Sequence, residues 1–149
     1  MLARWPFATL TDALTAGREE WFALTPDDWR EAFTHHPKIG DRDTLRRRFP
    51  ATHQLSEREQ SGVAGAPDDV LDALAAANRA YEERFGYIFI VCATGKSANE
   101  MLAILNQRLG NEPAVEIGVA AEEQAKITAL RITSTPPPQS PPPPAQPRP

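Results

Sequence analysis

This sequence has almost no cysteine: among its 149 residues only Cys92 carries a thiol. One thiol excludes an internal disulfide and a zinc site built from several cysteines, and it suits a reducing compartment. No apolar run is long enough to span a bilayer, and the N-terminus lacks the basic-then-apolar pattern of a secretory signal. The last residues carry no peroxisomal address. We therefore expect a cytoplasmic protein with no membrane partner.

The sequence also lacks an excess of positive charge. Lysine and arginine total 16 against 20 acidic residues, which gives a net charge of −4 and a pI near 5.4. Non-specific nucleic-acid binding needs clustered positive charge, so we expect no nucleic-acid partner. The hydrophobic share of 41% and the charged share of 24% are those of an ordinary soluble globular protein. This length suits one domain with a single core.

Glycine and proline fall where helices are expected to begin and end. Thr25 followed by Pro26 is a strong helix start, because threonine caps well and proline suits the first helical position. Apolar residues at helical spacing precede Gly86 and Gly110, where two helices are expected to stop. The pattern predicts helices over residues 11–16, from 26 to just before His36, and over 41–49, 68–85, 98–109 and 111–130, with a break near Gly118 left open.

We therefore expect an all-α fold, a single compact multi-helix domain over residues 1–133. After Thr133 the composition collapses to proline with a few small or polar residues. Such a segment cannot bury apolar surface, so residues 134–149 are predicted to form a disordered Pro-rich tail. A ligand role toward SH3-like domains is an alternative, but composition favours a passive tail.

The apolar run from Tyr87 to Ala93 is ambiguous. Its β-branched and aromatic content is typical of a buried strand, but periodicity cannot separate a short apolar run from a buried helical turn. No second convincing strand is present to pair with it, and an isolated strand would leave backbone groups unpaired. We predict extended or irregular chain buried among helices. The Gly95-Lys96-Ser97 sequence that follows imitates a phosphate-binding loop, but Ile90 stands where that loop needs a glycine, which excludes a nucleotide hydrolase.

Two neighbouring histidines, His35 and His36, stand directly before Pro37. Histidine titrates near neutral pH and can act as an acid or a base. The residue before a proline is pushed out of the helical region, so His36 is expected just past a helix end, where its side chain can point into a cleft. Taken alone, the pair is more typical of a helix end with solvated imidazoles.

Two further features are weak by themselves. Ser56-x-x-Glu59 is a capping-box pattern, and a structural role is its simplest interpretation. Arg108 lies on the apolar stripe of its helix, at helical spacing from Met101 and Leu105. A guanidinium there is costly to desolvate unless it meets an anion or extends past the edge of the apolar surface.

Together these signals resemble one family. The motifs are His36 to Asp41, Ser56-x-x-Glu59-Gln60, Phe85 to Ala93 and Arg108-Leu109-x-Asn111. In this order and spacing they resemble the 2-oxo-4-hydroxy-4-carboxy-5-ureidoimidazoline (OHCU) decarboxylases of urate breakdown, over about Trp5 to Leu130. The resemblance implies an all-helical enzyme that needs no cofactor, forms a homodimer and converts OHCU to (S)-allantoin with release of carbon dioxide. Family members usually carry a further helix ahead of this segment, and Leu55 stands where the family often has tryptophan.

The resemblance also implies roles for individual residues. His36 matches the catalytic histidine, described as the proton donor, and His35 has no such match. Glu59 matches an active-site acid that could orient the imidazole. The positions expected to bind substrate are Pro37, Ser56, Glu57, Arg58, Gln60, Phe89, Ile90, Val91, Cys92, Ala93 and Arg108.

Two other classes of function stay open from the sequence. One is a helical interaction module that uses the Pro-rich tail for partner binding. The other is a decarboxylase-like domain that has lost activity or needs a fused or separate partner. Loss of turnover on substitution of His36, but not on removal of the tail, would distinguish the enzyme from both.

Overall fold

A computed structural model of the protein describes residues 6–38, 40–49 and 68–134. These parts hold six helices and no strand, which confirms the all-helical prediction. The helices are α1 (Leu10–Phe22), α2 (Pro26–Phe33), α3 (Arg42–Arg48), α4 (Asp68–Phe85), α5 (Ala98–Leu109) and α6 (Pro113–Ser134). No helix in these ranges is long and apolar enough to cross a membrane.

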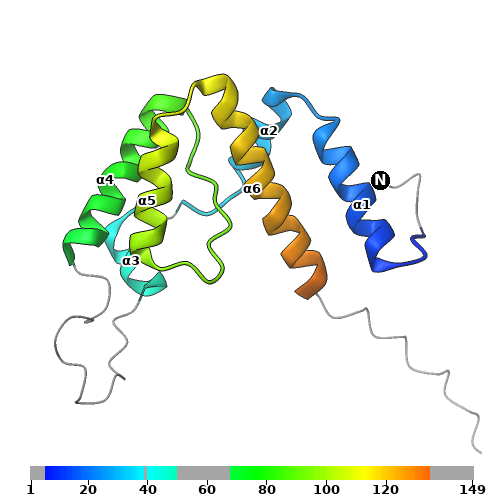
Figure 1. The fold of residues 1–149 in the computed structure, drawn as a ribbon, viewed down its shortest axis with the longest axis horizontal. Coiled ribbons are helices and arrows are strands. Elements are labelled where there is room, and N and C mark those ends of the chain that lie inside the picture. The colour runs from blue at the N-terminus through cyan, green and yellow to red at the C-terminus, as the bar shows by residue number, and fades with distance from the viewer. Residues whose placement is uncertain (1–5, 39, 50–67, 135–149) are drawn as a thin grey trace, which may run out of the picture.

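The helices α4 and α5 run in the same direction, pack side by side and form the largest part of the core (Figure 1). The chain that links α4 to α5 in sequence returns along the length of α5 as an extended segment from Tyr87. This confirms the prediction of irregular buried chain. α6 contacts α1 and α2, while α3 packs on α4. The largest fully buried side chains of the apolar core are Phe33, Leu45, Leu74, Tyr81 and Leu105.

The helix boundaries differ from the sequence prediction in two places. α1 does not end at Gly17 but continues to Phe22. A glycine inside a helix costs about 1 kcal/mol relative to alanine. Packing on α6 outweighs this cost, since the indole N–H of Trp21 donates to the Ala121 carbonyl at 2.9 Å. α6 begins at Pro113, whose ring suits a first helical position, and it runs through Gly118 without a break. It ends at Ser134, the first residue of the predicted tail, and residues 135–149 of that tail lie outside the described residues.

Three helices are joined by tryptophan hydrogen bonds. Trp29 of α2 donates its indole N–H to the Trp21 carbonyl of α1 at 2.9 Å, and Trp21 in turn donates to α6. The two indole rings also lie 6.2 Å apart, within the range of favourable aromatic pairs. This chain of contacts holds α2 against α6, and His36 lies in the turn that follows α2.

Candidate active site

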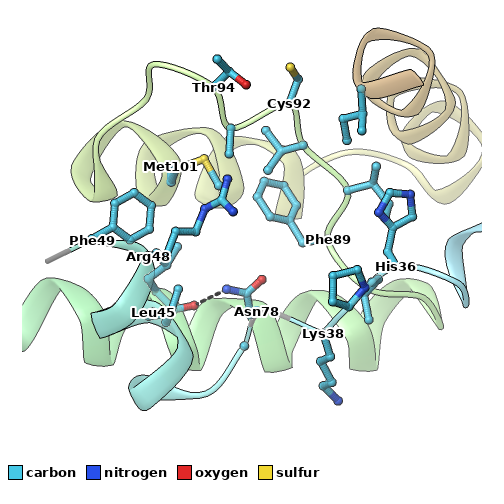
Figure 2. Close-up of a pocket in the computed structure, with 18 of the residues that line it drawn as sticks. His36, Lys38, Leu45, Arg48, Phe49, Asn78, Phe89, Cys92, Thr94 and Met101 are labelled. Carbon is cyan, nitrogen blue, oxygen red and sulfur yellow. Dashed lines mark hydrogen bonds between the residues drawn. The ribbon is translucent and has the colours of Figure 1, made fainter. Parts of the chain in front are cut away.

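A cavity of about 400 Å³ opens between α3, α4, the extended segment and the C-terminal half of α6. Its wall contains His36, Pro37 and Lys38 after α2, Asn78 on α4, the chain from Ile88 to Thr94, and Arg131 on α6. Figure 2 shows His36 and Phe89 beside the space, with Arg48 and Asn78 reaching in from other sides. The cavity therefore brings together the predicted His36 and Pro37 with the predicted segment Phe89–Ala93.

His36 is placed by the turn that ends α2. α2 ends at Phe33, and in the turn that follows the backbone N–H of His36 donates to the Phe33 carbonyl at 3.2 Å, directly before Pro37. The imidazole is half-buried and contacts the side-chain amide of Gln124 on α6 through Nε2. His35 points outward and is exposed. Of the two neighbouring histidines, His36 lines the cavity and His35 does not.

The extended segment is held by charged side chains on the side away from the cavity. Arg108 donates to the Ile90 carbonyl at 2.7 Å and Lys96 donates to the Cys92 carbonyl at 2.7 Å. The Cys92 N–H donates to the carboxylate of Glu123 at 2.7 Å. Successive residues of extended chain direct their backbone groups to opposite sides. The backbone groups of Val91 are therefore directed to the cavity side.

Glu123 is ionised at neutral pH. Burial opposes its charge, but hydrogen bonds from Lys126 and from the Cys92 N–H outweigh burial and lower the pKa of this carboxyl below its usual value. Ionised, it is an acceptor-only group at both oxygens. It can therefore hold the Cys92 N–H in one orientation, which keeps the cavity-facing edge of the segment in place.

Arg108 lies behind this edge and is absent from the wall of the His36 cavity. It is only 5% exposed, and its guanidinium meets the fully buried carboxylate of Glu116 at 2.6 Å. Tyr81 donates its hydroxyl to the same carboxylate, and Asn111 donates to it at 2.7 Å. Glu116 is thus the anion that an arginine on an apolar stripe requires. Direct contact of Arg108 with substrate stays a prediction.

Several residues of the cavity wall were missed by sequence reasoning. Arg131 is one, and it lies one helical turn after Ile127, a position that sequence analysis placed on the apolar stripe of the last helix. That spacing is the signal that could have found it. Arg48 ends α3 and extends its guanidinium toward Met101 and Phe89 in Figure 2. The cavity therefore carries more positive charge than the four sequence motifs predict.

The second predicted motif cannot be placed. Glu59, the predicted acid beside His36, lies outside the described residues, as do the predicted substrate contacts Ser56, Glu57, Arg58 and Gln60. Their roles stay predictions.

A helical domain that encloses a cavity of this size with an imidazole, an arginine and a row of backbone groups is built as an enzyme for a small polar substrate. The OHCU decarboxylase family model matches residues 1–133. The chain belongs to the OHCU decarboxylase family.

Known relatives agree with this assignment. A 2-oxo-4-hydroxy-4-carboxy-5-ureidoimidazoline decarboxylase of Amia calva is 38% identical over 133 residues, which cover 85% of this chain and 72% of the relative. The uric acid degradation bifunctional protein TTL of Arabidopsis thaliana is 37% identical over 125 residues, or 83% of this chain, but the match spans only 39% of that longer protein. A crystal structure of an OHCU decarboxylase in the presence of (S)-allantoin superposes with a TM-score of 0.66 at 36% identity, covering 88% of this chain and 84% of that one.

Proposed function

We propose that this protein decarboxylates OHCU to (S)-allantoin, a late step of urate degradation, in the cytoplasm and as a homodimer. The single observation that carries the proposal is the shared cavity of His36 and the Phe89–Ala93 segment, which combines an acid–base group with a row of backbone donors and acceptors. Family membership over residues 1–133 supports the same reaction. It favours the enzyme over a helical interaction module.

The reaction needs little from the protein beyond binding and one proton. When the bond to the carboxylate breaks, carbon dioxide leaves and the ring imine of the substrate accepts the electron pair. The carbon that bears the ureido group must then be protonated. An imidazole fixed on one side of the ring can deliver that proton to one face, and so sets the configuration of the product. No external electron acceptor enters this balance.

Each wall of the cavity then has a part in holding the substrate. The backbone groups of Val91 and its neighbours bind the polar edge of the ring and the ureido group, because amides pair well with fixed donors and acceptors. Pro37 packs against the ring beside His36. Glu59 favours the charged form of the imidazole, and Ser56, Glu57, Arg58 and Gln60 contribute further contacts. Arg108 acts through the Ile90 carbonyl that it holds.

Arg131 serves as the cationic contact for the substrate in this proposal. Arg131→Met is expected to raise KM by about ten- to a hundredfold, because a hydrogen bond to a charged group is worth about 1.5–3 kcal/mol. Arg131→Lys should recover only part of the loss, since an ammonium lacks the planar fork of a guanidinium. Steady-state kinetics measure the effect. Arg30→Lys is the matched control, as Arg30 is exposed on α2 and pairs with Asp27 at 2.7 Å. Equal KM values for the wild type and Arg131→Met would contradict the contact.

Freshly generated OHCU tests the function as a whole. The compound also decays without an enzyme, but protonation in water shows no facial preference and gives racemic allantoin. We expect the purified protein to accelerate the loss of OHCU and to produce a circular dichroism signal of (S)-allantoin. A rate and a racemic product equal to those of the protein-free solution would overturn the proposal.

A further inference from the structure

The imidazole of His36 rests on a buried polar side chain of α6. Gln124 is only 9% exposed, and its Oε1 contacts Nε2 of His36. Its Nε2 donates to the hydroxyl of Thr128, one turn along the same helix, at 3.1 Å. Buried amides are costly unless both ends are satisfied, and here each end has a partner. None of the sequence motifs includes Gln124 or Thr128.

This arrangement determines which nitrogen of His36 carries hydrogen. An amide oxygen can only accept a hydrogen bond, so Nε2 of the imidazole must be the donor. The Thr128 hydroxyl accepts from the other end of the amide, which keeps the amide oxygen turned toward His36. Nδ1 is then left with its lone pair, and Figure 2 shows it on the cavity side of the ring.

We propose that Gln124, held by Thr128, is a positioning residue that fixes His36 in its Nε2–H form and directs Nδ1 at the reacting carbon of the substrate. The role of Nδ1 as the atom that carries the proton rests on the function proposed above. The fixed tautomer and ring orientation do not, since they concern the free protein. In the turnover cycle Nδ1 receives a proton from solvent, gives it to one face of the substrate and returns to its neutral form.

The tautomer can be read directly in the free protein. Two-bond ¹H–¹⁵N correlation of the imidazole, at alkaline pH where histidine is neutral, distinguishes the Nε2–H form from the Nδ1–H form. His36→Asn assigns the His36 signals by their loss. We expect the wild type to show His36 in the Nε2–H form. Gln124→Met, which keeps the length but removes the acceptor, should give a mixture like that of the exposed His35.

Turnover supplies the second readout. Gln124→Met should lower kcat by about ten- to a hundredfold, the cost of a misplaced reacting group, while KM changes by less than about threefold. The optical purity of the allantoin should fall with kcat. Gln124→Glu retains an acceptor facing Nε2 and should keep both the Nε2–H form and most of the optical purity. Thr128→Val should fall between the two, since the amide then loses the contact that sets its orientation. Glu122→Gln is the matched control on α6, because Glu122 pairs with Arg18 at 2.8 Å.

The outcomes distinguish a positioning role of Gln124 from a role in packing alone. Folded Gln124→Met with an unchanged tautomer and unchanged optical purity would overturn the proposal. So would equal loss of kcat in the Glu and Met variants, because Gln124 would then serve packing alone. If Gln124→Met does not fold, Gln124→Glu and Thr128→Val decide the question by the same tautomer signals. If the wild type does not convert OHCU, the proposed function fails, while the tautomer comparison still decides the role of Gln124.

Discussion

His36→Asn is expected to lower the rate of allantoin formation by at least about a hundredfold, the usual scale for a positioned general acid or base. Asparagine keeps a polar side chain of similar reach but cannot carry and release a proton near neutral pH. The fold should survive, because His36 lies after the end of α2 and is only half-buried. The residual product should be racemic, since protonation then comes from water. Circular dichroism of the allantoin measures both the rate and the facial preference.

The neighbouring histidine supplies the control for this experiment. His35 has the same chemistry and lies one residue earlier, but its side chain is exposed. His35→Asn should therefore remain near the wild type in rate and in optical purity. If folded His36→Asn still produced optically active allantoin at the wild-type rate, His36 would be only a helix-end residue and the mechanism proposed above would be wrong.

The parts of the site that could be predicted from sequence are those with local causes. His36 was found because the following proline forces the chain out of the helix at that residue. The run from Tyr87 to Ala93 was predicted to be extended or irregular because its composition is typical of a strand, while no second strand is present to pair with it. The first of these predictions depends on two neighbouring residues, and the second on the composition of one short run and on the lack of a strand signal elsewhere in the sequence. The structure shows how His36 and the Tyr87–Ala93 run are related, because both contribute to the wall of one cavity.

The residues that the sequence analysis missed are brought to the site by the packing of helices. Gln124 looks like an ordinary polar position of α6, and the local signal for Arg131 is its spacing of one helical turn from Ile127. They face the site because Trp21 and Trp29 bring α2 against α6, a contact between residues about a hundred positions apart. The sequence could predict that Arg108 needs an anion. It could not predict that the turn between α5 and α6 places Glu116 beside it, because this also depends on helix packing.

The second large expected effect is a loss of stability when the buried pair of Arg108 and Glu116 is broken. Arg108→Met and Glu116→Gln are each expected to lower the free energy of unfolding by about 3–5 kcal/mol, because removing one partner leaves the other buried and uncompensated. The pair lies in a dense polar cluster. Burial and then the hydrogen bond to Glu116 raise the pKa of Tyr81 above its usual range, so its hydroxyl stays protonated and keeps donating to the carboxylate.

The comparison with the double variant tests whether the pair acts as a unit. A buried ion pair has little net value against apolar residues of similar size, since both charges must be desolvated. Arg108→Met combined with Glu116→Met should therefore cost less than the sum of the two single substitutions to Met. Urea denaturation followed by circular dichroism measures these free energies, and the loss in the single variants should correspond to a fall in Tm on the order of 10 °C. Additive losses in the double variant would contradict coupling between the two charges.

Arg108→Met and Glu116→Gln should differ in turnover although they lose similar stability. Arg108→Met removes the donor to the Ile90 carbonyl, so the extended segment loses one of the contacts that hold its edge toward the cavity. Glu116→Gln leaves that donor in place. At a temperature where both variants are folded, we expect a lower kcat/KM for Arg108→Met than for Glu116→Gln. Equal values would mean that Arg108 stabilises the fold without shaping the site. Arg108→Lys distinguishes direct contact with substrate from a supporting role. A stable variant with a raised KM would favour direct contact. A loss of stability comparable to that of Arg108→Met would assign Arg108 to the support of the Phe89–Ala93 edge.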